Sequence, residues 1–543
     1  LTNDTSEIRL VGNSQLIQTH TNNSKVNGAG ALYIDQDSPI ASTYRYNYMS
    51  SPVTSATNTF ILRDVLKDGT NPTSSSSTVK NINFIPGYNG NAASDPIDIA
   101  EYWIYTYASA DGSGSNWTQK GSTNAIPATD GYTFKGPGIA QNYTFTGTPN
   151  DGNLTTAIGA SEVYLVGNPY PSAISTKKFI EDNINSIDQG TLYFWQHAGE
   201  EDIISSNISG HNYGGYIGGY GTRNLSMGIG AHAVSSNNAT NDNIPSVGSG
   251  RYPEPAAYIP VGQGFFIGGN TNGGPIVFNN SQREYITEGD KSTFLKSNSK
   301  KKDQSKSTIV NQNENTLPII KLGLNYKSSE GKQFHRQIGI SFNKNNSFDY
   351  NVGYDSRVYE NTPTDFYWKF NNDATQYAIT GVQEITPELE VPLEIVVAND
   401  GDIDIGIDEW QNIDRNVFLK DKENDTIYTL NNGKVRLNLK QNTYSERFVL
   451  AFDEKEDQTD TPKKPFKLYF NKKNRKIVMV KKEPIQIKKV KLFKINGRKV
   501  QQWNIKKQKN KMKLKLRNNV KSGLYVVKVK TNKGVFKKKI LIE

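Results

Sequence analysis

The C-terminal segment from Lys463 to Glu543 differs in kind from the rest of the chain. The residues from Thr461 onwards include 29 Lys and Arg but only two acidic residues, a charge of +27, whereas the preceding 460 residues carry −17. The lysines alternate with apolar residues at a period of two, as in Lys511–Leu516. Because successive side chains of a strand point to opposite faces of a sheet, this pattern predicts half-buried strands with a solvated lysine face, and not a disordered basic arm.

The alternation extends over the whole segment. It defines seven expected strands: Phe466–Phe470, Lys476–Val480, Ile485–Ile495, Lys499–Ile505, Lys511–Leu516, Leu524–Lys530 and Val535–Ile542. Asn496-Gly497 lies between two apolar runs, where a type I′ hairpin turn needs positive φ at both central residues. Asn532-Lys533-Gly534 closes the last hairpin in a similar way. Seven short strands without a helix signal predict a small, seven-stranded, immunoglobulin-like sandwich.

Three sequence elements follow one another in this segment: the hairpin Lys491–Val500, the run Val520–Val529 and the ending Lys537–Glu543. In order and spacing they resemble the type A C-terminal sorting domain of the Bacteroidota type IX secretion system, which has "G-R/K-x-V", "SGxYxVxV" and "KKIxI" elements. The family usually opens with a Tyr-Pro-Asn-Pro-like element. This sequence departs from it and reads Leu468-Tyr469-Phe470-Asn471-Lys472 at that place.

The resemblance implies that this domain is a secretion signal. A giant β-barrel translocon would carry it through the outer membrane, a smaller outer-membrane β-barrel shuttle protein would receive it, and a sortase-like protease would remove it as the passenger is attached to the cell surface. The implied recognition residues are Gly497, Arg498, Ser522, Gly523, Tyr525, Lys538, Lys539, Ile540, Leu541 and Ile542.

We expect different roles within this set. Gly497 and Gly523 should be needed for backbone shape, the first in the hairpin turn and the second where a Cβ would clash. Tyr525 should fill the core. The terminal strand Val535–Ile542 should offer its backbone edge and lysines to the shuttle.

The composition of the whole chain excludes some function classes. Its 543 residues include no cysteine, so disulfides, thiolate metal sites and a cysteine nucleophile are excluded. No run of 18 or more apolar residues could span a membrane as a helix. The sequence starts at Leu1 without a leader peptide, so we expect the C-terminal part of a longer exported precursor, located at the cell surface or outside the cell.

We predict an all-β chain of several sandwich or jelly-roll-like domains in tandem. Turn-forming residues separate short β-type runs nearly throughout, and one convincing helix, Thr176–Ile184, follows the N-cap residue Ser175. The expected organisation is a β-rich surface region (1–160), a β-rich module with the helix (161–289), a flexible linker (290–316), a nine-stranded sandwich (317–452), a charged linker (453–465) and the sorting domain (466–543).

A second set of motifs lies in the N-terminal half: Leu165–Ile174, Gly190–His197 and Ile259–Ile267, together with Tyr48–Val53 and Phe145–Gly152. These motifs resemble a module found near the C-terminal end of large flavobacterial surface proteins. The resemblance implies location and architecture, and no chemistry.

Residues suited to catalysis are scattered. The five histidines are His20, His197, His211, His232 and His335. They form no His-x-x-x-His pair, and a Gly-x-Ser-x-Gly elbow is missing. The glycine-rich segment Gly210–Gly221 lacks the lysine of a phosphate loop, and we interpret it as a surface loop. We expect no enzymatic activity and no cofactor, although a pair of carboxylates for glycoside hydrolysis needs no sequence proximity and stays open.

One segment has metal-like spacing. Asp400, Asp402 and Asp404 could offer oxygen ligands to calcium, but an EF-hand counted from Asp400 requires Gly and Glu where this sequence has Ile405 and Gln411. The alternation of acidic and isoleucine residues favours an ordinary strand with one wet face. Calcium is therefore the weaker interpretation.

The basic C-terminal segment raises the question of its partners. Its aromatic residues are Tyr469, Phe493, Trp503, Tyr525 and Phe536. Each lies in a strand whose apolar face must form the core, so we expect no nucleic-acid binding. A charge of +27 would be attracted to anionic lipopolysaccharide.

Two functional hypotheses follow. The first is a non-enzymatic cell-surface protein, adhesin-like or structural, exported by the type IX system. The alternative is the C-terminal part of a secreted hydrolase, with its catalytic domain upstream of Leu1 or its carboxylate pair within the β-regions.

Overall fold

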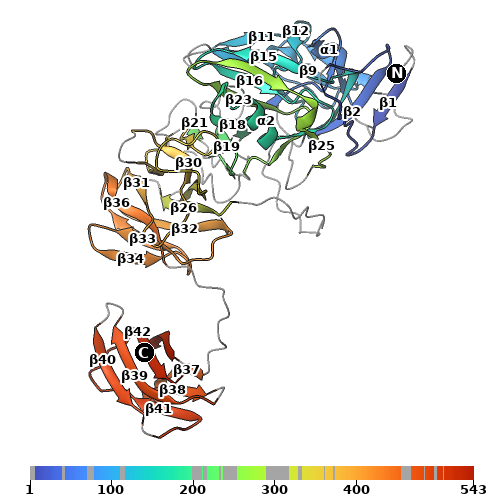
Figure 1. Cartoon of the computed structure of the whole chain (residues 1–543). Coiled ribbons are helices and arrows are strands. Elements are labelled where there is room, and N and C mark those ends of the chain that lie inside the picture. Colours follow the sequence, from blue (N-terminus) through green and yellow to red (C-terminus); the bar gives the residue numbers. More distant parts are fainter. Residues whose placement is uncertain are drawn as a thin grey trace. The chain divides into compact units, whose positions relative to one another are not determined.

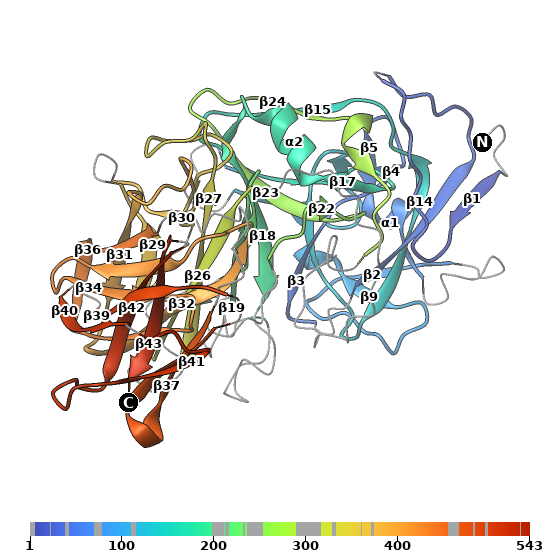
Figure 2. The same ribbon diagram turned by 60° about the horizontal axis from the view of Figure 1, so that its bottom comes forward.

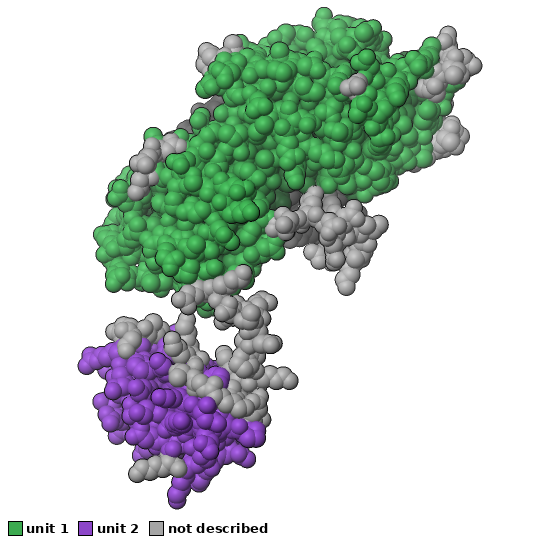
Figure 3. Space-filling view, viewed as in Figure 1, with its two compact units in different colours: residues 1–454 green, residues 455–543 purple. Residues whose placement is uncertain are grey.

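The chain forms two compact units, Leu1–Glu454 and Lys455–Glu543 (Figures 1 and 3). The computed structural model describes residues 6–21, 23–38, 43–69, 79–109, 116–197, 211, 217–231, 234–235, 254–288, 317–327, 333–359, 361–370, 374–453, 466–481, 484–494, 498–505, 507–532 and 534–542. The expected linker 290–316, the linker 453–465 apart from Asp453, and Gly497 lie outside these residues. No helix in the described part is long and apolar enough to cross a membrane.

Both units consist of β-sheets, which confirms the predicted all-β class. The first sheet of the N-terminal unit contains, in spatial order, β1 (Glu7–Leu10), β2 (Ala31–Ser38), β14 (Gln141–Pro149), β6 (Leu66–Asp68) and β7 (Lys80–Asn81), with β4 (Val53–Thr54) also on β14. Two short pairs accompany it, β5 (Thr59–Ile61) with β12 (Ala125–Pro127) and β8 (Asn83–Ile85) with β9 (Asp98–Ala100). The turns α1 (Leu62–Val65) and η1 (Glu101–Trp103) lie between these strands in the sequence.

A ten-stranded sheet connects the two halves of the N-terminal 289 residues. Its order is β20 (Gly228–Ile229), β19 (Ile217–Arg223), β18 (Ile187–His197), β23 (Gly264–Gly269), β16 (Val163–Gly167), β10 (Tyr105–Ser109), β13 (Tyr132–Lys135) and β3 (Tyr46–Met49), with β11 (Trp117–Gln119) on β10 and β21 (Val234–Ser235) on β19. Because β10 pairs with β16, the expected boundary between residues 160 and 161 falls inside one sheet. Strands that pair across so many residues carry no pattern in their own sequence that predicts the pairing.

Short elements cover this sheet. They are β15 (Leu154–Ile158) with β24 (Gly274–Phe278), the trio β22 (Tyr258–Ile259), β17 (Ala173–Ser175) and β25 (Arg283–Glu284), the helix α2 (Thr176–Asn183) and the turn η3 (Asn280–Gln282). The Oγ of Ser175 accepts a hydrogen bond from the backbone N–H of Lys178, as its expected N-cap role requires. Phe179 and Ile180 bury the inner face of α2.

The interpretation of Gly210–Gly221 as a surface loop is wrong for its described second half. Ile217–Gly221 belongs to β19, which pairs with β18. Glycine is needed here because the position has no room for a side chain. A Cβ on Gly221 would lie 2.9 Å from Oε1 of Gln196 and 2.9 Å from Cγ of Pro255.

The region from residue 317 to 453 forms an eleven-stranded sheet that curves around one core. Its order is β34 (Thr426–Thr429), β33 (Val417–Asp421), β36 (Asn442–Phe452), β31 (Glu390–Val397), β29 (Asp365–Trp368), β30 (Tyr377–Val382), β27 (Gln333–Phe342), β26 (Ile319–Lys327), β32 (Gly401–Gln411) and β35 (Val435–Leu439), with β28 (Ser356–Arg357) on β30. Nine strands were expected, and the short β28 and β29 are the additional ones. Hydrogen bonds to the ten-stranded sheet, such as Thr191 Oγ1 to Ser356 Oγ at 2.8 Å, make this region part of the N-terminal unit.

Asp130 gives the N-terminal unit a specific pH dependence. The carboxylate is buried and accepts hydrogen bonds from the hydroxyl of Tyr164 (2.8 Å) and Oγ1 of Thr129 (3.3 Å). Burial raises its pKa to about 6. The native carboxyl therefore takes up a proton near pH 6 but the unfolded one only near pH 4, so this group makes the fold more stable as the pH falls through that window.

We expect Asp130→Asn to stabilise the N-terminal unit at pH 8, because the amide still accepts from Tyr164 without the cost of burying a charge. A shift of about two pKa units corresponds to roughly 2–3 kcal/mol. Thermal unfolding should show a higher Tm for the variant at pH 8, and a much smaller difference at pH 4. A gain of equal size at both pH values would contradict this assignment.

Candidate functional site

The C-terminal unit consists of two sheets that share one core. The three-stranded sheet has the order β37 (Phe466–Asn471), β38 (Lys476–Lys481) and β41 (Lys511–Lys515). The four-stranded sheet has the order β40 (Lys499–Asn504), β39 (Ile487–Lys494), β42 (Gly523–Thr531) and β43 (Gly534–Ile542), and its strands are labelled in Figure 2. The turn η4 (Lys472–Asn474) connects β37 to β38. These are the seven strands that the period-two alternation predicts.

The alternation separates core from surface in this unit. On β41 Met512 and Leu514 are buried, whereas Lys511, Lys513 and Lys515 are exposed. Tyr469 is an exception to the expectation that every aromatic side chain here faces the core, because it is 37% exposed. It lies between Leu468 and Phe470 on β37, in the outward phase of the strand.

Most of the recognition residues that the structure describes lie at one end of the four-stranded sheet, whereas Lys538 lies in the middle of β43. The register pairs Gly523 with Ile542 and Tyr525 with Ile540 across β42 and β43. On the other side of β42, Tyr525 pairs with Lys494 of β39, whose backbone N–H donates to the carbonyl of Arg498. Ser522 directly precedes β42. The end of β39, the start of β40, the start of β42 and the end of β43 therefore meet.

Tyr525 and Gly523 shape this end in different ways. The Tyr525 ring is 4% exposed in the core, and its hydroxyl donates to the carbonyl of Lys521 at 2.8 Å. The expected clash at Gly523 is wrong, because a Cβ there would meet only Cε2 of Tyr525 at 3.8 Å, an ordinary contact. Glycine is favoured instead by the backbone, whose φ of +151° L side chains rarely adopt.

The terminal strand β43 contributes both to the core and to the surface. Ile540 and Ile542 are buried. Lys538 is paired with Val527 in mid-strand, and its Nζ donates to the carbonyl of Leu468 at 2.8 Å, so it ties the two sheets together. The side chains of Lys539 and Leu541 lie outside the described residues.

Three residues at this end of the sheet were missed by sequence reasoning. Lys494 and Lys521 are exposed, as is Arg498, whose carbonyl accepts from the backbone N–H of Lys494. Leu524 is 43% exposed on the outward face of β42, whereas Lys494 pairs with the inward Tyr525. Leu524 could have been found, because Tyr525 must point inward and its neighbour must then point outward. We call Lys494, Arg498, Lys521 and Leu524 the basic end patch.

The calcium candidates occupy a polar strand face. Asp402 and Asp404 lie on β32, where they accept from Nδ2 of Asn438 and from Nε and Nη2 of Arg436 on the paired strand β35. Asp400 accepts from Nζ of Lys440 at 2.8 Å. The hydrogen bonds from Arg436 lower the pKa of Asp404. In the described part of the chain, no group of three His, Cys, Asp or Glu is placed to hold a metal ion.

The described histidine side chains lie at separate places. Nε2 of His20 is 2.9 Å from Asp151, and Nε2 of His335 is 2.8 Å from Asp408. His211 stacks on Trp103 and contacts the buried Nζ of Lys135. The side chain of His197 and all of His232 lie outside the described residues.

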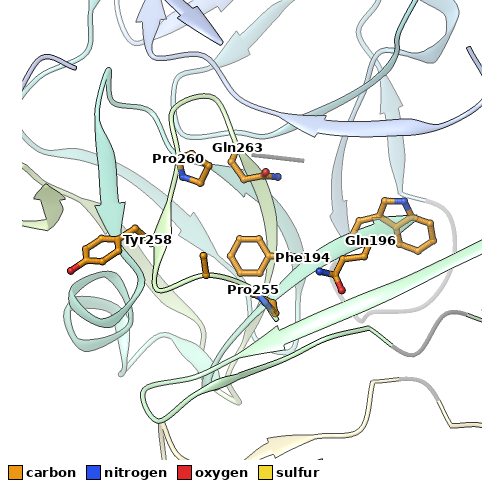
Figure 4. Close-up of a pocket in the computed structure, with 8 residues that line it drawn as sticks. Phe194, Gln196, Pro255, Tyr258, Pro260 and Gln263 are labelled. Carbon is orange, nitrogen blue, oxygen red and sulfur yellow. The ribbon is translucent and has the colours of Figure 1, made fainter. Parts of the chain in front are cut away.

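A shallow hollow opens beside β18. It is lined by Phe194, Gln196 and Pro255, with Tyr258, Pro260 and Gln263 on the adjoining segment (Figure 4). Its volume is about 20 Å³, which leaves room for about one water molecule. A second hollow, at Thr222 and Arg336, is about 10 Å³. Neither could enclose a sugar or a peptide substrate.

Comparison with known families divides the chain as the structure does. The family described as "Domain of unknown function (DUF8693)" matches residues 2–452. The chain belongs to this family. The DUF8693 region therefore coincides with the N-terminal unit, and a second family, "Secretion system C-terminal sorting domain", matches residues 469–543 of the C-terminal unit. This sorting domain marks the DUF8693 protein for export by type IX secretion, to the cell surface or the extracellular space.

Other comparisons add little to this assignment. No curated protein matches the chain. Among solved structures it has a likeness to one described as "Biofilm associated protein - BSP domain", at 9% identity over 94% of this chain and 92% of that chain. The TM-score of 0.13 is too low to carry a structural argument.

Proposed function

We propose that this chain is a non-enzymatic, adhesin-like surface protein whose C-terminal unit is read by the type IX translocon barrel and its outer-membrane shuttle. The observation that carries the proposal is that Ser522, Gly523 and the C-terminal end of β43 lie at the same end of the four-stranded sheet as the basic end patch. The exposed cations at this end offer a partner charge complementarity, and the exposed Leu524 on the outward face of β42 offers an apolar contact. The edge strand β43 adds backbone groups to which a partner strand can pair.

In the described part of the N-terminal unit, the hollows beside β18 and at Thr222 hold little more than water, whereas enzymes bind small substrates in pockets of roughly 300–1,000 Å³. A sortase-like protease would remove the sorting domain at the surface. The charge of +27 suits contact with anionic lipopolysaccharide during transfer.

A charge reversal within the full-length chain tests this recognition. We expect the double variant Lys494→Glu with Arg498→Glu to lose surface delivery at least roughly tenfold, since a lost charged contact costs about 1.5 kcal/mol or more. The control is Lys511→Glu with Lys513→Glu, an identical change of charge on exposed positions of β41. Surface delivery is measured by protease accessibility on intact cells, and folding of both variants by thermal unfolding.

The complementary experiment fuses Lys455–Glu543 to an inert periplasmic reporter in a host with a working type IX system. The proposal requires the reporter to reach the cell surface. A reporter that stays in the periplasm, or a control variant that is lost as completely as the end-patch variant, would refute it.

A further inference from the structure

The ten-stranded sheet has an unusual second face. In an antiparallel sheet with one face on the core, the other face is normally polar and alternates with it along each strand. The inward residues of this sheet, such as Phe265 on β23 and Phe134 on β13, do belong to the two cores of the region. The outward residues, however, are also aromatic. We call Tyr48, Tyr107, Tyr193, Trp195, Tyr220 and Phe266 the aromatic face.

Strand register places these rings on the same side of the sheet. Tyr193 on β18 pairs with Phe266 on β23, and Trp195 pairs with Tyr220 on β19. Leu165 on β16 pairs with Phe266, and β10 pairs with the other side of β16. Figure 1 shows β16, β23 and β18 as neighbours. The aromatic face thus extends across β19, β18, β23, β16 and β10, and Tyr48 joins it from β3, which bridges the segment before β23 through Met49 and Gln263.

The rings form one contact network around Phe266. Its centroid lies 5.5 Å from Tyr48, 5.4 Å from Tyr107 and 5.7 Å from Tyr220, all with edge-to-face geometry. Trp195 lies 5.1 Å from Tyr220. Edge-to-face packing of this kind holds aromatic rings rigidly and adds about 0.5–1.5 kcal/mol per pair. The face is therefore a preformed platform that loses little conformational entropy on binding.

The platform is buried at its centre and open at its margins. Phe266 and Tyr48 are 3% and 7% exposed, whereas Tyr107, Tyr193, Trp195 and Tyr220 are half-buried. Tyr359 packs 4.8 Å from both Tyr193 and Tyr220 and is 44% exposed. Partly exposed aromatic side chains in a contiguous group typically mark a binding surface.

We propose that the aromatic face binds a neutral polysaccharide, with the C–H faces of successive sugar rings stacked on the exposed rings. The surface offers ring faces and phenolic hydroxyls with few aliphatic side chains, the chemistry that a hydroxylated ring with an apolar face requires. The inference names a ligand class for the adhesin-like role and rests on that part of the proposed function.

The charge of the N-terminal region and the extent of the aromatic face further restrict the class of polysaccharide that can bind. The first 460 residues carry −17, which disfavours phosphate-rich and acidic polymers. The two charged residues that act on Tyr193, Arg357 and Asp188, form an ion pair at 3.9 Å and offset each other. Because the Phe266 ring lies 5.4 Å from Tyr107 on β10 and 5.7 Å from Tyr220 on β19, the rings at these two margins are no more than about 11 Å apart. The face is therefore short, and affinity should rise from a monosaccharide to a short oligosaccharide and then level off.

The test uses the purified full-length chain and four neutral polysaccharides (cellulose, xylan, laminarin and mannan), with polyanionic alginate for comparison. Binding is measured by co-sedimentation and affinity electrophoresis, with and without 0.5 M NaCl. We expect retention on at least one neutral glycan, little weakening by salt, and recovery of the glycan uncleaved. Binding to alginate alone, binding abolished by salt, or no binding to any of the glycans would overturn the inference.

Matched variants identify the surface. Trp195→Ala and Tyr359→Ala should each weaken glycan binding roughly tenfold, the equivalent of one stacking contact. Trp410→Ala and Tyr285→Ala replace a tryptophan that is 43% exposed and a tyrosine that is 59% exposed elsewhere on the unit, and should bind as the parent does. Equal losses in both pairs would refute the site. Tyr359 is at the margin, so its variant keeps the test valid if Trp195→Ala misfolds.

This experiment is independent of secretion. Export is measured in cells through the C-terminal unit, whereas glycan binding is measured on purified protein through the N-terminal unit. A chain that is exported but binds no glycan refutes this inference alone, and a chain that binds glycan but is not exported refutes the sorting proposal alone.

Discussion

Replacing Tyr525 with alanine is expected to unfold the C-terminal unit while the N-terminal unit stays folded. The ring is 4% exposed, belongs to the core cluster of the unit, and lies on the strand position paired with the buried Ile540. Removing a buried aromatic side chain costs about 3–5 kcal/mol. A core of this size seldom supplies more than about 3–5 kcal/mol in total. The cost of the cavity should therefore be about as large as the free energy of unfolding of the whole unit.

Scanning calorimetry of the full chain measures this directly, because the two units should unfold in separate transitions. The transition of the C-terminal unit should disappear in Tyr525→Ala, and export should be lost with it. Tyr525→Phe is the matched control. It removes only the hydrogen bond to the carbonyl of Lys521, worth about 1 kcal/mol, and should keep both transitions. Two unchanged transitions in Tyr525→Ala would show that the ring is not part of the core.

Replacing Arg283 with methionine is expected to destabilise the N-terminal unit by about 3–5 kcal/mol, the usual cost of leaving a buried charge without its partner. The side chains of Arg283 and Asp151 are both inaccessible, and Nη1 lies 3.8 Å from Oδ1. The guanidinium also donates to Ser172, Gln18 and Asn280 and to the carbonyl of Leu16, and it lies 4.7 Å from the centre of the Tyr170 ring.

This cluster fixes the N-terminal segment onto the rest of the unit. Burial lowers the pKa of Arg283 only to about 10, so the group stays charged at neutral pH. Burial alone would raise the pKa of Asp151, but hydrogen bonds from the Lys25 backbone, Asn280 and His20 hold it below the ordinary value. Without Arg283 the carboxylate would lose the buried guanidinium 3.8 Å away, and the N-terminal segment would lose the hydrogen bonds from Arg283 to Gln18 and to the carbonyl of Leu16.

Urea unfolding of the N-terminal transition measures the loss. The control is Lys178→Met, which breaks the exposed pair between Lys178 and Glu284, the residue next to Arg283. Exposed pairs contribute about 0–1 kcal/mol, so this variant should unfold near the parent midpoint. If both variants shifted the midpoint equally, the buried network would not be the anchor.

The sequence predicts local features of this protein much better than long-range ones. The seven C-terminal strands follow from the alternation of lysine with apolar residues, because the phase of each strand shows which face is wet. The helix α2 follows from the N-cap Ser175 and the spacing of Phe179 and Ile180. In each case the residues that form the signal lie within a few positions of one another in the sequence.

Long-range features left no such signal. The pairing of β10 with β16 joins strands more than fifty residues apart in the sequence. The residues before and after position 160, where a domain boundary was expected, therefore belong to one sheet. In Tyr193-Phe194-Trp195 both phases of the strand are aromatic, and the pattern cannot say which face is outside. The sorting residues were named by resemblance, but only the strand register brings Arg498, Ser522 and Ile542 to one end of the sheet.

The two edges of the four-stranded sheet are β40 and β43, and each carries exposed lysine, Lys499 on the first and Lys538 on the second. An edge strand is a template onto which the edge of another copy can add, which is the first step of aggregation. Two edges lined with lysine repel each other when they approach. We therefore expect the lysines that give the segment its charge also to keep copies of the protein from pairing edge to edge before export.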